Sequence, residues 1–281
     1  MSRIDDEVGE PLFHEISDSD AVTARDSSAK RKRGGDEDQK NGNKVAKKRK
    51  KVKGLKVVEE GTIDSQLGVN FAIARMDGKL LADYIAQRTK RFQPDLSLVE
   101  VEDIHIPEQA IVDTSGWKRS RTMDELPDFL EHFCVLRGEK KEELVRAPNE
   151  KGSPHTLVIA GAGLRSANLT RALRKFQTKE SLVAKLFAKH IKLKEAVEMV
   201  KNTRMGIGIG TPQRIMDLLD DGALSSKHLQ RIVVDASHID LKKRGILDMR
   251  ETQQPLVRLL SRPDLKGRYR DAQSRVDLLF F

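Results

Sequence analysis

Six short apolar runs of strand length follow one another between residues 109 and 281, with helical patterns between most of them. Small residues bound these runs, as they commonly bound strands. The runs are QAIVDT (109–114), TLVIAG (156–161), LVAKLFA (182–188), GIGIGT (206–211), RIVVDA (231–236) and RVDLLFF (275–281). Strands that alternate with helices indicate a parallel sheet covered on both faces. We therefore predict an α/β fold.

Apolar residues at helical spacing predict the helices. Leu80, Leu81, Tyr84 and Ile85 lie between charged residues, with Gly78 before them and Pro94 after them, which predicts a helix over 78–91. The same reasoning predicts helices within 123–133, 166–176, 192–200, 212–221 and 251–261. The pattern of alternating elements covers residues 65–281, which we take as one domain.

Residues 1–55 carry no such pattern, and their composition predicts a disordered tail. Residues 1–29 hold two basic and eight acidic side chains, a net charge of −6, whereas residues 30–53 hold twelve basic and three acidic, a net charge of +9. The remaining residues carry +6. A basic domain behind a strongly basic arm suits a polyanionic partner such as RNA. The alternative is a basic domain that carries only a targeting signal.

Two basic clusters in the tail, separated by a polar spacer, have the pattern of a bipartite nuclear import signal. They are formed by Lys30, Arg31, Lys32, Arg33, Lys47, Lys48, Arg49, Lys50 and Lys51. Such clusters bind an acidic groove of a nuclear import receptor, and they also bind RNA phosphates without sequence preference. We therefore expect a nuclear protein.

Several classes of protein are disfavoured by composition. The single cysteine, Cys134, excludes an intramolecular disulfide framework, which fits a reducing compartment. No apolar run is long enough to cross a bilayer, and the acidic N-terminus lacks the features of a secretory signal. We expect no membrane partner, no metal site and no cofactor.

The chemistry of a parallel sheet lies in the loops that leave the carboxyl ends of its strands. The first loop, DTSGWKRS (113–120), has one glycine and no GK[ST], so it does not match a phosphate-binding loop. AGAGLRSANL (160–169) resembles the glycine turn of dinucleotide or S-adenosylmethionine sites. A tight turn between a strand and a helix is an equally good reading of that segment.

GTPQRIMDLL (210–219) is a more specific segment. Pro212 fits the first position of a helix, where its missing N–H costs nothing, and Thr211 is then the N-cap. Its hydroxyl is free for a helix N–H or a phosphate, and Arg214 on the first turn can fork onto a phosphate. The alternative is an ordinary cap beside a surface arginine.

The stretch GIGIGTPQRIMDLLDDGALSSKHLQRIVVDASHIDL resembles the region of DEAD-box RNA helicases from their TPGR motif to VLDEAD. TLVIAGAGLRSANLTRALRKF takes the place of their PTREL segment, and QAIVDTSGWKRS that of their ATP-gripping loop. The resemblance covers about residues 65–281 and implies one degenerate RecA-like domain of the P-loop NTPase type.

The roles of the helicase residues carry over unevenly. Asp235 matches the aspartate that holds Mg²⁺ through water, but Ala236 replaces the glutamate that orients the attacking water, so no general base is left. Ser237 and His238 take the last two positions of that motif. The helicase residues that touch the RNA backbone are matched by Thr211 and Arg214, together with Gly210, and approximately by Gly161 and Arg165. The resemblance implies a pseudo-helicase that keeps part of an RNA-binding surface.

A lysine-rich tail on one degenerate domain, together with VVDASHID and the terminal LLFF, resembles the Cms family of ribosomal small-subunit assembly proteins, which are classed as subunits of the 90S pre-ribosomal complex. This resemblance implies nucleolar residence, a role in rRNA processing, and association with small-subunit processome proteins and pre-rRNA. Three alternatives stay open: a protein-only adaptor, a residual nucleotide-dependent ATPase, and a methyltransferase-like enzyme that uses AGAGLRS.

Overall fold

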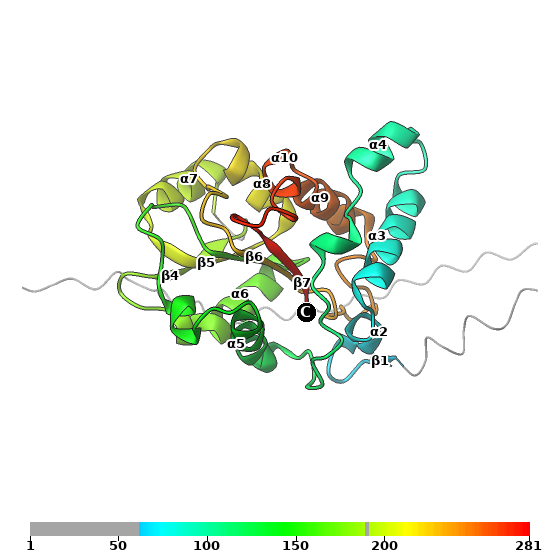
Figure 1. Ribbon diagram of the computed structural model, residues 1–281, viewed down its shortest axis with the longest axis horizontal. Coiled ribbons are helices and arrows are strands. Elements are labelled where there is room, and N and C mark those ends of the chain that lie inside the picture. The colour runs from blue at the N-terminus through cyan, green and yellow to red at the C-terminus, as the bar shows by residue number, and fades with distance from the viewer. Residues whose placement is uncertain (1–61, 189–190) are drawn as a thin grey trace, which may run out of the picture. The chain divides into compact units, whose positions relative to one another are not determined.

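The central sheet of the described residues has five parallel strands in the order β4–β5–β3–β6–β7 (Figure 1). In chain order they are β3 (Thr156–Ile159), β4 (Leu182–Leu186), β5 (Met205–Gly210), β6 (Arg231–Val234) and β7 (Asp277–Phe280). Every neighbouring pair of strands runs parallel. The predicted parallel α/β sheet is therefore confirmed.

This computed structural model describes residues 62–188 and 191–281, which belong to the compact unit Lys51–Phe281. The predicted tail (1–55), with the two clusters of the predicted import signal, lies outside the described residues. No helix within the described part of the chain is long and apolar enough to cross a membrane.

Helices cover both faces of the sheet (Figure 1). One face packs against α5 (Leu126–Leu136) and α6 (Gly163–Ala172), and the other against α3 (Gly78–Phe92), α7 (Leu193–Asn202), α8 (Pro212–Asp220) and α9 (Arg250–Leu260). Successive side chains of a strand point to opposite faces. Accordingly, Leu157 and Ile159 of β3 join the core beneath α3 and α9, while Val158 joins the core beneath α5.

Short elements complete the fold. They are β1 (Ile63–Asp64), β2 (Val69–Asn70), α2 (Phe71–Ala74), α4 (Leu98–Asp103), α10 (Pro263–Lys266) and the 3₁₀ turns η1 (Glu108–Ala110), η2 (Met123–Glu125), η3 (Lys141–Val145) and η4 (Leu173–Phe176). The β1–β2 hairpin, which the sequence pattern did not predict, is antiparallel, and Val69 pairs with His238. The hairpin therefore lies against the degenerate helicase motif.

The predicted helices are present with small shifts at their ends. The prediction 78–91 corresponds to α3, where the Asp77 carboxylate accepts a hydrogen bond from the Leu80 N–H at 2.8 Å and so caps the first turn. The prediction 166–176 starts too late, because α6 begins at Gly163 and continues from Ala172 into η4.

The predicted strand at 109–114 is wrong. Its first residues form η1, and only Ile111 makes a parallel bridge, with Leu278 of β7. Beyond that bridge, the Thr114 hydroxyl donates to the Phe280 carbonyl at 3.1 Å, so a side chain replaces the backbone donor that would extend a strand. A turn begins there, because the Asp113 carboxylate accepts a hydrogen bond from the Ser115 N–H at 2.8 Å.

Candidate nucleic-acid interface

Three of the predicted loops leave the sheet at the same edge. Ile159 at the end of β3 is aligned with Gly210 at the end of β5 and with Val234 at the end of β6. The residues that follow these strand ends, Gly161, Thr211 and Asp235, therefore lie on neighbouring turns. Parallel strands explain this, because all of their carboxyl ends meet at one edge of the sheet.

The turn from Gly210 to Arg214 has the local structure that its sequence predicts. Pro212 is the first residue of α8, and Thr211 is the N-cap residue in an extended conformation. The Thr211 hydroxyl makes no capping hydrogen bond. The Arg214 Nη2 donates to the Ile191 carbonyl at 3.2 Å, whereas its Nη1 is buried with no hydrogen-bond partner in the described residues. This turn therefore holds a hydroxyl and a guanidinium nitrogen that the protein does not use.

Asp235 and Arg165 form a closed ion pair. The Arg165 Nε donates to one carboxylate oxygen of Asp235 at 2.8 Å, and its Nη2 donates to the other at 3.0 Å. Asp235 is 2% exposed and the Arg165 side chain 13%. A two-pronged pair of this kind satisfies a buried carboxylate fully. The sequence analysis assigned separate roles to the two residues. RNA binding by Arg165 stays a prediction, and two of its guanidinium nitrogens already donate to Asp235.

This pairing bears on the magnesium ion that the helicase resemblance implies. The Asp235 carboxylate already has a cation within hydrogen-bond distance of both oxygens, and the next residue, Ala236, supplies no ligand. In the described residues, no group of three or more histidine, cysteine, aspartate or glutamate side chains is placed to hold a metal ion. The residues at this position do not fit a divalent cation.

Backbone contacts hold the rest of the degenerate motif. The N–H groups of Ala236 and Ser237 both donate to the Phe281 carbonyl, at 2.9 and 2.8 Å, and the Asn70 N–H donates to the Ser237 carbonyl at 2.7 Å. Ser237 is fully buried, and its hydroxyl has no partner among the described residues. Burial lowers the pKa of His238; Asp235 raises it and Arg165 lowers it further. These residues are therefore packed into the fold, and the β1–β2 hairpin contacts them on one side.

A second buried arginine fills the region of the first loop. The Arg121 side chain is 1% exposed and donates hydrogen bonds to the carbonyls of Phe280 and Thr114 and to the Thr114 hydroxyl. Burial lowers the pKa of Arg121 to about 10, and the nearby Asp113 opposes that shift. The sequence analysis missed this residue because KRSR offers three similar cations, and only the fold selects the one that points inward.

The surface beside this loop is basic and aromatic. A pocket of about 480 Å³ is lined by Phe71, Ala74, Arg75, Ser115, Trp117, Lys118, Arg119 and Ser120. The Trp117 ring is largely buried and packs edge-on against Phe129, with centroids 5.6 Å apart. Arg119 is held by Glu125 and Asp128. Two of the side chains in the wall, Trp117 and Arg119, are therefore held by contacts within the fold.

The two candidate glycines differ in how much the fold needs them. A Cβ atom on Gly210 would clash with the Leu186 carbonyl of the neighbouring strand, so this position admits no side chain without a backbone shift. A Cβ atom on Gly161 would lie 3.5 Å from Ile246, which is ordinary contact. Only at Gly210 is the absence of a side chain a requirement of the fold.

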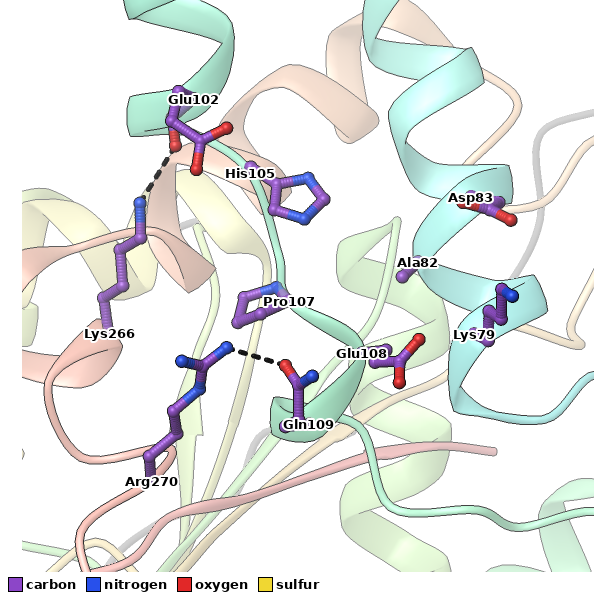
Figure 2. A pocket seen from close by; sticks show the side chains of 10 residues that line it. All are labelled: Lys79, Ala82, Asp83, Glu102, His105, Pro107, Glu108, Gln109, Lys266 and Arg270. Atoms are coloured by element: carbon purple, nitrogen blue, oxygen red, sulfur yellow. Dashed lines mark hydrogen bonds between the residues drawn. The ribbon is translucent and has the colours of Figure 1, made fainter.

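Another pocket, of about 530 Å³, lies between α3, the end of α4, η1 and the segment after α10 (Figure 2). Acidic and basic side chains both line it. The Lys266 Nζ donates to the Glu102 carbonyl at 3.0 Å, and the Arg270 Nη2 donates to the Gln109 Oε1 at 2.7 Å (Figure 2). These bonds fasten α4 and η1 to the C-terminal part of the domain.

Comparisons with known proteins agree on one family. The family model described as a U3-containing 90S pre-ribosomal complex subunit, CMS1, matches residues 16–281. The chain is 55% identical to Protein CMS1 of Chaetomium thermophilum over 223 residues, which are 79% of this chain and 87% of the relative. It is 30% identical to Protein cms1 of Schizosaccharomyces pombe, over 64% of this chain and 62% of the relative.

Two further matches are more distant. Human Protein CMSS1 is 29% identical over 65% of this chain and 59% of the relative. Among solved structures, the yeast DEAD-box splicing factor Prp28 is similar with a TM-score of 0.42 and 13% sequence identity, over 84% of this chain and 52% of that chain. The match to the family model over most of the chain shows that the chain belongs to the CMS1 family of 90S pre-ribosomal complex subunits.

Proposed function

We propose that this protein is a non-enzymatic, RNA-binding subunit of the 90S pre-ribosome that acts in the nucleolus in small-subunit assembly and rRNA processing. One observation carries the proposal. At one edge of the sheet, Asp235 is paired with Arg165, while in the neighbouring turn the Thr211 hydroxyl makes no capping bond and one buried nitrogen of Arg214 has no hydrogen-bond partner in the described residues.

The chemistry of that turn suits a phosphate. The N-terminus of a helix presents unpaired N–H groups and a partial positive charge, both of which favour an anion. The Thr211 hydroxyl adds a donor at the N-cap position. Arg214 on the first turn of α8 adds a positive charge, and it can donate to phosphate oxygens by turning away from the Ile191 carbonyl to which its Nη2 now donates. A backbone contact of this kind carries no sequence preference, so selection of a particular RNA requires further contacts.

Three features support a role without turnover. Both oxygens of Asp235 are engaged by Arg165, Ala236 has no side chain that could orient water, and Arg121 occupies the interior of the first loop. Phosphoryl transfer needs charge stabilisation of the phosphates and a positioned nucleophile. The pairing of Asp235 also counts against the residual ATPase that the sequence left open.

The tail extends the proposal beyond the described residues. Its clusters at Lys30–Arg33 and Lys47–Lys51 have the composition to engage a nuclear import receptor and to add phosphate contacts once the protein is in the nucleus. Processome proteins and pre-rRNA are the partners that the family assignment suggests for the assembled complex.

The test is a fluorescence anisotropy titration of the full-length protein with a labelled single-stranded RNA at several salt concentrations. The variant Thr211→Ala/Arg214→Ala should bind about tenfold more weakly than the wild type, which corresponds to about 1.4 kcal/mol. The slope of log affinity against log salt should fall by about 0.7 for the lost phosphate contact.

A matched control uses the opposite edge of the sheet. Thr178 precedes β4 and Arg275 precedes β7, so Thr178→Ala/Arg275→Ala removes the same pair of side-chain types at the amino ends of the strands. The control should bind RNA like the wild type. Equal affinity of both double variants and the wild type would exclude the proposed RNA-binding turn.

A protein-only adaptor is the second candidate, and α4 is the observation that favours it. Leu98 is 89% exposed and Val99 is 71% exposed, on a short helix that carries a capping box from Ser97 and Glu100. Exposed apolar residues on an ordered helix suit a protein partner. Crosslinking in cells separates the two candidates: crosslinks to RNA support the first, and crosslinks to proteins alone support the adaptor.

A further inference from the structure

The loop that follows the degenerate motif has an unusual backbone. We call residues 240–245 the basic loop. The Asp240 N–H donates to the Arg244 carbonyl at 2.9 Å, and the Lys243 N–H donates to the Asp240 carbonyl at 2.8 Å. Lys243 has a φ of 59°, the only positive φ of a residue other than glycine in the described part of the chain. A lysine in this conformation is held there by its surroundings.

One carboxylate supplies most of that hold. Asp240 Oδ1 accepts hydrogen bonds from the N–H groups of Lys242 and Arg244, and Oδ2 accepts from the Arg244 Nε and Nη2. The Arg244 side chain holds the pKa of Asp240 below its usual range. The Arg244 side chain is therefore bonded within the loop, whereas the side chains of Lys242 and Lys243 are not.

The base of the loop is fixed to the domain. Ile239 and Ile246, on either side of it, are buried, and the Ile239 N–H donates to the Gly68 carbonyl at 2.9 Å. The Gly245 N–H donates to the Asp248 Oδ2 at 2.9 Å. Ile246 lies 3.5 Å from the Cβ position of Gly161. The basic loop thus stands beside the turn that opens α6, at the carboxyl edge of the sheet.

The tip of the loop points fully into solvent. Leu241 is 105% exposed, which means that it contacts almost nothing in the protein, and Lys242 and Lys243 are exposed too. Neither lysine side chain makes a hydrogen bond or an ion pair with the described residues, whereas Lys118 and Lys266 both do. An isolated exposed leucine is ordinary in proteins. Here the leucine is presented by a strained loop next to two lysines whose side chains have no partner among the described residues.

We propose that the basic loop is a second RNA contact, in which Lys242 and Lys243 bind phosphates and Leu241 packs against the face of an unpaired base. This inference rests on the proposed function and names the form of RNA that the surface prefers. Stacked bases of an A-form duplex hide their faces, whereas single strands expose them. The loop should therefore distinguish single-stranded RNA from duplex RNA.

Charge is the reason to choose RNA over a protein surface. The tip offers two lysines and one apolar side chain and lacks a groove, so its interaction area is small and mainly electrostatic. Lysines bind phosphates as point charges without a required orientation. Leu241 against one base and the two lysines against the neighbouring phosphates together make a contact about as large as one nucleotide.

The experiment titrates the full-length protein against a labelled single-stranded RNA and against the same sequence in a duplex. Lys242→Glu/Lys243→Glu should weaken single-strand binding at least about tenfold and lower the salt slope by about 1.4, for two lost phosphate contacts. The control Lys151→Glu/Lys179→Glu makes the same change of charge with exposed lysines at the amino ends of β3 and β4. It should weaken binding less than about threefold.

Leu241→Ser tests the base contact separately. It should weaken single-strand binding about threefold, leave duplex binding and the salt slope unchanged, and differ from Leu136→Ser, which removes an exposed leucine at the end of α5. Thermal melts of each variant verify that the fold is intact.

The outcomes separate this inference from the proposed function. If the basic-loop variants bind like their controls while Thr211→Ala/Arg214→Ala binds weakly, the basic loop is not an RNA contact and the proposed function stands. If the lysine variant weakens binding but Leu241→Ser does not, the base contact is excluded. If the basic-loop and Thr211/Arg214 variants all bind RNA like the wild type, both ideas fail and a protein partner is indicated.

Discussion

Two turns at the same edge of one sheet differ in whether their polar side chains have partners within the protein. After β6, Asp235 is buried and both its oxygens are bound by Arg165. After β5, Thr211 caps α8 without a side-chain hydrogen bond, and Arg214 has a nitrogen without a partner. The polar groups of the first turn are paired within the protein, whereas two polar groups of the second have no partner in the described residues.

The difference follows from the cost of burying a charge. A buried carboxylate without a partner is strongly unfavourable, so the buried Asp235 requires a cation beside it. Arg165, in the first turn of α6, is that cation. A hydroxyl, or one nitrogen of a guanidinium whose other nitrogen is bonded, carries a smaller penalty, so the β5 turn can keep these groups without a partner. Asp235 therefore contributes to stability through its partner, whereas the Thr211 hydroxyl makes no capping bond that would tie it to α8.

The largest expected effect is on stability and concerns the turn after β6, where Asp235 is paired with Arg165. Asp235→Ala leaves the Arg165 guanidinium largely buried without its partner and should lower the free energy of unfolding by about 3 kcal/mol, measured by urea denaturation. The control Asp128→Ala removes an exposed aspartate that also has two cationic partners, Arg119 and Lys175, and should cost less than about 1 kcal/mol.

A double variant distinguishes pairing from packing at this position. Arg165→Met/Asp235→Leu removes both charges and keeps most of the volume, so it should recover much of the stability that Asp235→Ala loses. A double variant as unstable as Asp235→Ala would show that the ion pair itself is not what the single substitution breaks.

The second prediction concerns the buried Arg121. Arg121→Lys keeps the positive charge but cannot reach the Phe280 carbonyl and the Thr114 carbonyl together, and an ammonium is harder to desolvate than a guanidinium. The free energy of unfolding should fall by about 2 kcal/mol. The exposed substitution Arg75→Lys, in the neighbouring pocket wall, should leave it within about 0.5 kcal/mol of wild type. A fully stable Arg121→Lys would show that this region tolerates any cation.

The sheet was largely predictable from the sequence because its strands are short apolar runs that alternate with helices. TLVIAG and RIVVDA are buried on both faces and need no information from distant residues to be recognised. The segment 109–114 also contains a short apolar run, but its pairing is cut short by the Thr114 hydroxyl and by Arg121, which bond to β7. Such contacts between distant residues leave no local pattern.

The candidate site was predictable in position but not in pairing. The resemblance to a helicase identified Asp235 and Arg165 separately, 70 residues apart in the chain. Their ion pair depends on the alignment of β3 with β6, which sets the first turn of α6 beside the end of β6. The basic loop was missed because LKKR is common on protein surfaces, and only the backbone of Lys243 and the four bonds to Asp240 set it apart.

The third prediction uses His238 as a probe of the closed turn. Burial lowers its pKa below the usual 6.5, so the folded protein binds the proton less well than the unfolded chain. Stability from this group is therefore present above a pH of about 6.5 and is lost as the pH falls below it. A His238→Asn variant should lose less stability than wild type between about pH 7 and pH 5.

An NMR titration of the His238 ring sharpens this comparison. Asp235 raises the pKa of His238 and Arg165 lowers it. Asp235→Ala should therefore move the midpoint further down, and Arg165→Ala should move it up. If neither substitution changes the midpoint of the His238 titration, the ion pair does not lie beside the imidazole.

The smallest expected effect on stability concerns the turn after β5, which holds Thr211. Thr211→Ala removes a hydroxyl that makes no capping bond, so the free energy of unfolding should change by less than about 0.5 kcal/mol in the absence of RNA. Asp77→Ala removes a cap whose carboxylate accepts the Leu80 N–H and should cost about 1 kcal/mol. If Thr211→Ala costs as much as Asp77→Ala, the hydroxyl serves α8 itself. The β5 turn would then be as closed as the β6 turn, and the contrast between them would no longer point to a ligand.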